Sequence, residues 1–277
     1  MSYDAPGPGG LDYAPCRYGR SRMLFRGPAR PLSGDYVACL GGTETYGKYV
    51  ARPWPARLEA AAGLPCVNFG GVNAGLDSFL GEPQVLEAAS RARLTIVQAM
   101  GAQNLSNRYY RVHPRRNDRF LGPTPLMRHL FPATDFTEFH FTRHMTGALA
   151  RRAPEHFGRL RSGLRETWVA RMEALLDRVE APVVLLWFAA APPPERAGSP
   201  QSPEPLFVDR GMIEALRPRL AAVVEAVPGP AARGEGTCGM VFPPLEAPAA
   251  AQLPGPQAHQ EVADALLPVL RAHLPQQ

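Results

Sequence analysis

The chain has 277 residues, of which 45% are hydrophobic and 20% are charged, and its formal net charge at pH 7 is +5. This composition is typical of a globular protein with a sizeable core and excludes a fibrous or disordered chain. No apolar run approaches the ~20 residues of a membrane span, and residues 1–10 lack the pattern of a secretory signal, so we expect a cytoplasmic protein without a membrane span.

The positive charge does not by itself indicate a nucleic-acid partner. Lys48 is the only lysine, and the excess of arginine accompanies 31 prolines, a bias typical of GC-rich genomes. Since no recognition motif is present either, we expect no nucleic-acid partner. The four cysteines form no CxxC pair, so we predict no zinc site, no redox motif and no cofactor. Cys39 and Cys66 fall in predicted strands and are expected to be small core residues.

The first third of the chain predicts alternating strands and helices. Residues 1–34 are rich in glycine, proline and arginine and predict an extended N-terminal arm on the surface. After it, the sequence predicts strands over Tyr36–Leu40, Pro65–Phe69 and Leu94–Met100, with helices over Pro55–Ala62 and Glu82–Arg91. These strands are apolar almost throughout, which is typical of parallel strands that are buried on both faces. The order favours a parallel sheet with helices on both sides.

The rest of the chain interrupts this pattern once and then resumes it. Residues 104–131 are polar and irregular, and Thr137–Val179 is mostly helical with apolar residues at helical spacing. The remaining elements are a strand Pro182–Phe188, a loop Ala190–Pro205, a helix Asp209–Leu220, a strand Ala222–Val227 and a final helix Gln257–Leu274. We therefore predict one α/β domain over residues 35–274. It has a doubly wound, flavodoxin-like parallel sheet of about five strands, in three layers, and an inserted helical and loop segment at about 105–180.

The segment Gly41–Gly47, with the sequence GGTETYG, follows the first strand directly. Two glycines allow the backbone to turn sharply there. The hydroxyl of Thr43 would then lie just past the carboxyl end of a strand, where open α/β sheets bind their ligands. The alternative is a simple strand-to-helix turn in which Thr43 only caps the helix.

Four segments resemble, in order, the sequence blocks of the SGNH (GDSL-type) hydrolase superfamily. They are Gly41–Gly47, Asn68–Gly75, Gly101–Asn104 and Pro256–His259. The resemblance implies an esterase or acyltransferase in which Thr43 attacks and His259 takes its proton. It also implies that the amide of Gly71 or Gly75, together with Gln103 or Asn104, holds the oxyanion. The chain further resembles an alphaproteobacterial protein family, of uncharacterised activity, that shares the GGTETYG and GAQN signatures.

Three residues depart from the superfamily pattern. Thr43 stands in place of serine, Gln103 in place of the oxyanion asparagine, and Pro256 in place of the triad aspartate. That aspartate fixes the histidine tautomer in serine-type catalysis, and its loss costs on the order of 10⁴ in rate. Another carboxylate could replace it through space, and the candidates are Glu44, Asp77 and Asp118. The alternative function is a catalytically degenerate binding or assembly protein that recognises an anionic ligand.

A basic stretch follows the third block directly. Five arginines, two tyrosines and a histidine lie within residues 108–119. Guanidinium groups bind carboxylate and phosphate oxygens with two parallel hydrogen bonds. The stretch therefore predicts a lid that binds a small-molecule anionic or acylated substrate through Arg108, Arg111, His113, Arg115 and Arg116. The alternative is a solvated basic loop in which Asp118 is paired internally.

Two histidines in the middle of the chain raise the question of a metal. His140 and His144 are four residues apart and would share one face of a helix, near Asp135 and Glu138. No known metal-binding signature matches, and Asp135 and Glu138 are equally suited to cap the helix. We therefore predict no metal site here.

Overall fold

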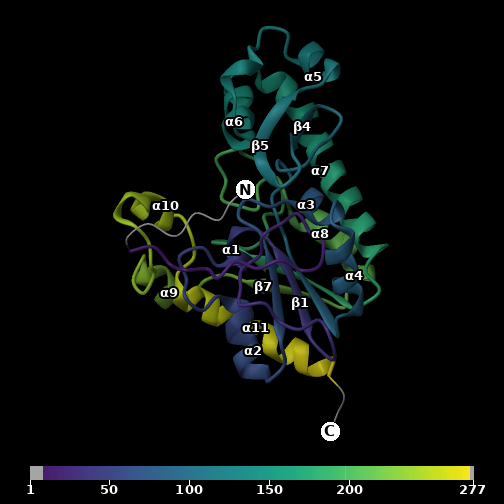
Figure 1. Cartoon of the computed structure of the whole chain (residues 1–277). Coiled ribbons are helices and arrows are strands. Elements are labelled where there is room, and N and C mark those ends of the chain that lie inside the picture. The colour runs from purple at the N-terminus through teal and green to yellow at the C-terminus, as the bar shows by residue number, and fades with distance from the viewer. Residues whose placement is uncertain (1–8, 197, 275–277) are drawn as a thin grey trace.

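The computed structural model describes residues 9–196 and 198–274 and is built on a five-stranded parallel sheet (Figure 1). The strands are β1 (Val37–Gly41), β2 (Cys66–Gly70), β3 (Leu94–Gln98), β6 (Val183–Phe188) and β7 (Ala222–Ala226). Their order across the sheet is β2-β1-β3-β6-β7, and every pair is parallel. The predicted α/β class and the predicted number of strands are confirmed.

The four strands β2, β1, β3 and β6 are buried along their whole length, as their apolar sequences predict. Only the edge strand β7 is partly exposed. The chain runs from β1 outward to β2 on one side, and then returns to place β3 on the other side of β1. The order of the strands therefore reverses between β1 and β3, and a crevice for ligands is expected at the carboxyl ends of these two strands.

Helices cover both faces of the sheet. The helices on one face are α2 (Trp54–Ala62), α9 (Pro230–Glu235) and α11 (Pro256–Ala272). The helices on the other face are α3 (Leu76–Leu80), α4 (Pro83–Arg91), α7 (Pro154–Leu176) and α8 (Arg210–Leu216). Side chains of β1 alternate between the two cores: Val37 and Cys39 belong to one, Ala38 and Leu40 to the other. Cys39 and Cys66 are both buried in the α2–α11 core, as expected of small core residues.

The segment between β3 and β6 is partly a separate lobe at the top of Figure 1. It holds an antiparallel pair, β4 (Tyr110–His113) and β5 (Arg116–Pro123), and the helices α5 (Pro125–Leu130), η1 (Phe136–Glu138) and α6 (Thr142–Arg152). The prediction that residues 104–131 are irregular was wrong, because this segment contains the β4–β5 hairpin and α5. One face of the hairpin is buried through Tyr110, Val112 and Phe120, but the polar residues of its exposed face hid this pattern in the sequence.

The N-terminal arm has little regular structure in residues 9–34 beyond one antiparallel bridge between Cys16 and Phe25. It is nevertheless anchored, because Tyr18, Met23 and Phe25 are buried in the larger core. The remaining short elements are α1 (Thr43–Tyr46), η2 (Arg217–Arg219), η3 (Pro244–Glu246) and α10 (Ala247–Ala250).

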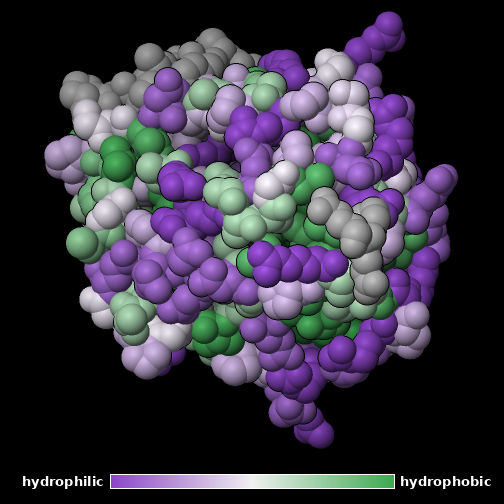
Figure 2. Space-filling view, turned by 90° about the horizontal axis from the view of Figure 1, so that it is seen from below, coloured by the Kyte–Doolittle hydropathy of each residue, from purple (hydrophilic) through white to green (hydrophobic). Residues whose placement is uncertain are grey.

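The lower end of the molecule carries hydrophilic side chains intermixed with smaller apolar areas (Figure 2). Large hydrophobic side chains that are exposed include Leu121, Phe141 and Leu245. Within residues 9–196 and 198–274, none of the helices combines the length and the apolar character that a membrane span requires.

Candidate functional site

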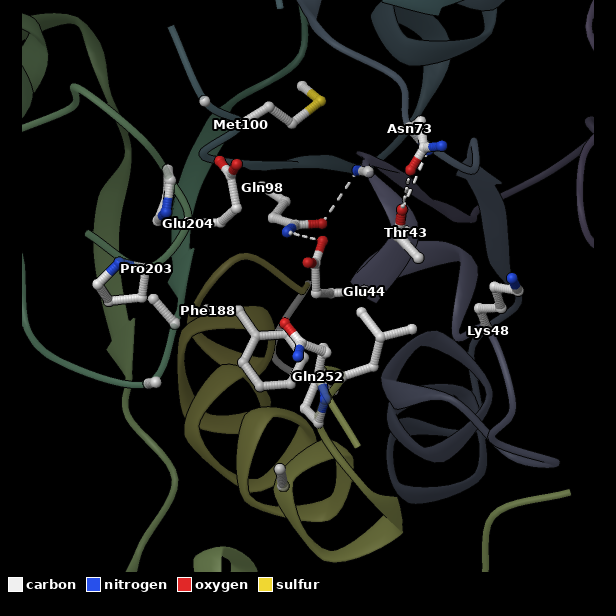
Figure 3. Close-up of a pocket in the computed structure, with 18 of the residues that line it drawn as sticks. Thr43, Glu44, Lys48, Asn73, Gln98, Met100, Phe188, Pro203, Glu204 and Gln252 are labelled. Carbon is white, nitrogen blue, oxygen red and sulfur yellow. Dashed lines mark hydrogen bonds between the residues drawn. The ribbon is translucent and has the colours of Figure 1, made fainter. Parts of the chain in front are cut away.

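A cavity of about 830 Å³ opens at the carboxyl ends of the parallel strands. Its walls come from the turn after β1, the loop after β2, the end of β3, the end of β6, and the segments around 203–205, 228–236 and 249–258. This is the edge where the strand order reverses, and its size is that of a site for a small molecule. The cavity is therefore the candidate functional site (Figure 3).

The turn after β1 is held by one buried amide, Gln98, at the end of β3. Gln98 Oε1 accepts hydrogen bonds from the amide of Gly42 (3.1 Å) and from the amide and hydroxyl of Thr45 (3.2 and 2.6 Å). A Cβ atom on Gly41 would lie 2.2 Å from Thr45 Oγ1 and 2.6 Å from Gln98 Oε1, so this position requires glycine. The two strands and the turn thus form one rigid wall of the cavity.

Gln98 also fixes the carboxyl group of Glu44. Its Nε2 donates to Glu44 Oε2 at 2.8 Å, and the carboxyl group lies beside the Gln98 amide in the cavity (Figure 3). Burial raises the pKa of Glu44, the hydrogen bond from Gln98 opposes this rise, and the charge of Glu204 adds to it. A carboxyl group with a raised pKa in a cleft is typical of a proton donor or acceptor in catalysis.

Glu204 is a second carboxylate of the same cavity, and its surroundings differ from those of Glu44. Its Oε1 accepts from Gln103 Nε2 (2.8 Å) and Arg143 Nη1 (2.9 Å), and its Oε2 accepts from the amide of Leu206 (2.8 Å). Sequence reasoning missed Glu204, because it lies in the Pro/Ser-rich loop 190–205, which no motif marks.

Thr43 lines the cavity, as the sequence predicts, but its hydroxyl is engaged with the loop after β2. Thr43 Oγ1 accepts from the amide of Asn73 (3.0 Å) and donates to Asn73 Oδ1 (3.3 Å). Asn73 Nδ2 in turn donates to Asp118 Oδ2 at 3.1 Å. A hydroxyl that donates to a neutral amide is not activated for attack in this arrangement, since no base receives its proton.

His259 does not have the surroundings of a general base. Its ring is buried, packs edge-on against Phe188 with ring centroids 5.3 Å apart, and accepts the amide hydrogen of Trp54 at Nδ1 (3.1 Å). Burial, with a smaller contribution from Arg57 and then Arg26, lowers its pKa to about 3. The neutral ring therefore carries its proton on Nε2, whereas a triad histidine needs Nε2 free to accept one. His259 instead satisfies the first backbone amide of α2.

The predicted oxyanion donors are mostly occupied. The amide of Gly71 donates to Gly41 O (3.0 Å), the amide of Gly75 donates to Asn117 Oδ1 (2.7 Å), and the side chain of Gln103 is bound to Glu204. Asn104 lines the cavity, and its Oδ1 accepts from the hydroxyl of Thr142 (2.7 Å). Asn104 Nδ2 bonds to no other part of the described chain, whereas the amides of Gly71 and Gly75 are both used and Gln103 Nε2 already donates to Glu204.

The five predicted substrate-binding residues lie along and before the β4–β5 hairpin. Arg108 pairs with Glu166 of α7 (3.2 Å), Arg111 donates to Asn107 O (3.4 Å), and Arg115 donates to Arg22 O (3.4 Å). His113 Nδ1 accepts the amides of Arg115 and Arg116 in the hairpin turn. Within the described residues, the walls of the cavity include none of the five; the hairpin contributes Asp118 instead.

The cations that do line the cavity are Lys48, Arg143 and Arg233. Lys48 pairs with Glu246 at 3.2 Å and Arg143 with Glu204 at 2.9 Å, while Arg233 donates to the carbonyl of Pro228 at 2.7 Å. A ligand anion would therefore find Arg233 the least committed of the three.

Asp77 and the two central histidines are not part of the site. Asp77 accepts from Arg171 Nε (2.8 Å) and the amide of Ser106 (2.7 Å), and so fastens α7 to the loop after β3. His140 precedes α6 and His144 lies within it, so the two do not share a helical face. In the part of the chain that the structure describes, there is no group of three or more histidine, cysteine, aspartate or glutamate side chains that could hold a metal ion.

Comparison with known protein families identifies the family of the chain. A family model described as a domain of unknown function (DUF6473) matches residues 1–274, which is nearly the whole chain. No protein with a curated description matches. The description of the family states no activity, so the chemistry of the cavity is the basis for a function.

Proposed function

The chain belongs to the DUF6473 family, and we propose that it is an SGNH-like esterase or acyltransferase in which Glu44, rather than His259, transfers the proton. A water molecule or an acceptor hydroxyl attacks the ester carbonyl, and Glu44 takes its proton. The bond to the leaving alcohol then breaks, and Glu44 returns the proton to the leaving oxygen. Glu44 thus acts first as general base and then as general acid.

The observation that carries this proposal is the setting of the Glu44 carboxyl group. It lies in the cavity, one hydrogen bond from Gln98 holds it in place, and burial raises its pKa. General acid–base catalysis is most efficient when the pKa of the group lies near the working pH, and buried carboxyl groups approach it from below.

The fold and the motifs support the same reaction class. The strand order, with helices on both faces, is compatible with a doubly wound SGNH-like fold. All four segments that resemble SGNH blocks contribute residues to the walls of one cavity; they are Gly41–Gly47, Asn68–Gly75, Gly101–Asn104 and Pro256–His259. In this proposal the side-chain amide of Asn104 stabilises the oxyanion. The anionic part of the substrate binds beside Arg233, because Lys48 and Arg143 already have carboxylate partners.

A second candidate function is a binding protein that keeps the cavity without turnover. The occupied amides of Gly71 and Gly75 and the bound ring of His259 favour it, because they leave fewer catalytic donors than a serine-type hydrolase has. The two candidates differ in one measurable respect: an esterase hydrolyses its ligand through Glu44, whereas a binding protein does not hydrolyse it.

The test is hydrolysis of p-nitrophenyl acetate and p-nitrophenyl butyrate by the full chain and by Glu44→Gln. We expect Glu44→Gln to lower kcat by about 10²–10⁴-fold, the usual contribution of a general acid or base. The matched control is Glu87→Gln, since Glu87 is an exposed carboxylate on α4 that pairs with Arg91 and does not line the cavity. Hydrolysis that survives in Glu44→Gln overturns the role of Glu44. A wild-type chain that binds these esters without hydrolysing them supports the binding protein instead.

A further inference from the structure

The β4–β5 hairpin holds the loop that follows β2. The fully buried Asn117 accepts at Oδ1 from the amide of Gly75 (2.7 Å), the amide of Ser78 (3.2 Å) and the hydroxyl of Ser78 (2.7 Å). Its own Nδ2 donates to His113 O in the hairpin (2.9 Å). The inserted hairpin and the loop 73–78 are therefore joined rigidly at the edge of the cavity.

Asp118, the next residue, controls the side chain of Asn73. Asp118 Oδ2 accepts from Asn73 Nδ2, and Asp118 Oδ1 is buried without a hydrogen-bond partner in the described chain. An ionised carboxylate cannot donate a hydrogen bond. While Asp118 is ionised, the NH₂ group of Asn73 must face Asp118 and its Oδ1 must face Thr43, so the usual ambiguity of an amide orientation is removed.

This orientation decides what Thr43 can offer to a ligand. A threonine hydroxyl has one hydrogen to donate and two lone pairs to accept with. The hydrogen goes to Asn73 Oδ1, and one lone pair receives the amide hydrogen of Asn73. The second lone pair is left for the cavity that Thr43 lines. A ligand can therefore donate to Thr43 but cannot accept from it.

We infer that Asp118 is a positioning residue that acts through Asn73 to make Thr43 an acceptor, so that the cavity selects substrates with a hydroxyl or amino donor beside the reacting group. The selection of esters rests on the proposed function, whereas the positioning of Asn73 does not. A neutral hydrogen bond contributes about 0.5–1.5 kcal/mol, so the preference for a donor is expected to be about three- to tenfold.

The first arm of the experiment compares p-nitrophenyl glycolate with p-nitrophenyl methoxyacetate, which differ in one hydroxyl hydrogen replaced by methyl. We expect wild-type kcat/KM, corrected for the uncatalysed rates, to favour the glycolate about three- to tenfold. The ratio falls toward one in Thr43→Val and Asp118→Ala. An intermediate ratio is expected in Asp118→Asn, because its side-chain amide can either accept from Asn73 or donate to it; this near-isosteric variant also guards against a folding defect in Asp118→Ala. An unchanged ratio in Asp118→Ala overturns the inference.

The second arm needs no activity and follows the side-chain NH₂ signals of Asn73 by NMR as the pH is changed. Burial raises the pKa of Asp118, while Arg119, Arg116 and His113 of the hairpin oppose this rise; the group facing it from the loop after β2 is the neutral amide of Asn73. We expect the Asn73 signals to follow the ionisation of Asp118, and this step to disappear in Asp118→Asn. Its absence from the wild type overturns the inference, even in an active esterase.

The two arms separate the inference from the proposed function. If the Asn73 signals follow Asp118 but neither ester is hydrolysed, the proposed function fails and the positioning stands. Selectivity is then measured by the shift of the Asn73 signals on adding glycolamide or methoxyacetamide. A stronger effect of glycolamide supports the inference, and equal effects contradict it.

Discussion

Gln98 at the end of β3 donates a 2.8 Å hydrogen bond to Glu44 in the turn after β1. The same side chain accepts three hydrogen bonds from Gly42 and Thr45, so one amide both folds the turn and aims the carboxyl group. These two residues are 54 positions apart in the sequence, and the parallel pairing of β1 with β3 brings them together.

Replacing Gln98 with leucine should destabilise the protein, because the change leaves buried donors of the turn without an acceptor. Each unsatisfied buried group costs roughly 1–3 kcal/mol, so we expect a loss of about 2–4 kcal/mol in the free energy of unfolding. Urea denaturation measures it. The control, Gln257→Leu at an exposed position of α11, should change stability by less than about 0.5 kcal/mol. Equal effects of the two variants would contradict the role of Gln98.

Replacing Gly41 with alanine tests the tight packing of the same turn. The new Cβ would meet Thr45 Oγ1 at 2.2 Å and Gln98 Oε1 at 2.6 Å. Overpacking of this kind costs about 1–3 kcal/mol, which thermal denaturation detects as a lower Tm. Gly122→Ala is the matched control, since nothing lies within 4 Å of its added Cβ. A Tm for Gly41→Ala equal to that of Gly122→Ala would show that the turn is more open than described.

Glu44→Gln should raise stability at neutral pH while it removes activity. The folded-state pKa of Glu44 is raised above its ordinary value of 4.5, mainly by burial. The ionised carboxylate therefore disfavours the folded state once the pH exceeds the ordinary pKa, and this cost disappears as the pH falls below it. Denaturation at pH 7 and pH 4 should show the stabilisation by Glu44→Gln at pH 7 only. A variant less stable than wild type at pH 7 would be inconsistent with a strained catalytic carboxylate.

His259 should make the protein sensitive to acid. Its pKa is lowered from 6.5 to about 3, chiefly by burial. Below pH 6.5 the imidazole of His259 therefore binds a proton in the unfolded chain but stays neutral in the folded chain. Stability is then lost steadily as the pH falls from about 6.5 to about 3, by about 1.4 kcal/mol per pH unit. His259→Asn, which keeps an acceptor for the amide of Trp54, should reduce this slope, while His129→Asn at an exposed position of α5 should not. The same slope in both variants would place the acid sensitivity elsewhere.

Arg233, rather than the hairpin arginines, should bind an anionic substrate. Hydrogen bonds to charged groups contribute about 1.5–3 kcal/mol, so Arg233→Ala should raise KM for mono-(p-nitrophenyl) succinate by roughly tenfold or more. The neutral p-nitrophenyl acetate should show no such rise. The double variant Arg115→Ala/Arg116→Ala is the control, because neither side chain lines the cavity that the described residues form. A rise of KM for the succinate ester in the double variant, without one in Arg233→Ala, would instead support the substrate-binding lid that the sequence predicted.

The sequence predicted the core of the fold well, because buried parallel strands are apolar along their length. Each of the five strands lies within one or two residues of its predicted position. Helix α2 ends at Ala62, and the next residue, Gly63, adopts a left-handed φ of 67° that glycine reaches without strain. The β4–β5 hairpin was missed, since the many polar residues on its exposed face masked the alternation of buried and exposed positions that is typical of strands. Residues 1–8, part of the predicted arm, lie outside the described residues.

The site was predicted less well than the fold, and the reason is specific to each residue. The Gly-Gly-Thr turn was located correctly, because a polar turn after an apolar strand marks the carboxyl edge of the sheet. A sequence motif, however, predicts where His259 lies in the chain but not which group its ring contacts. In the structure the ring accepts a hydrogen bond from the amide of Trp54. Glu204 and Gln98 carry no local signal at all, and Asp118 was predicted only as one of three carboxylates that could replace the triad aspartate.

The sequence alone thus determined which segments become buried strands and which end of the sheet gathers polar turns, since both follow from continuous apolar runs that end in polar, glycine-containing turns. Only the tertiary structure decided which side chains meet in the cavity and which protonation states they prefer. Those depend on neighbours far apart in the chain: Gln98 beside Glu44, Asn73 between Thr43 and Asp118, and the amide of Trp54 beside His259. Hydrogen bonds and burial act through space, so no local pattern records them.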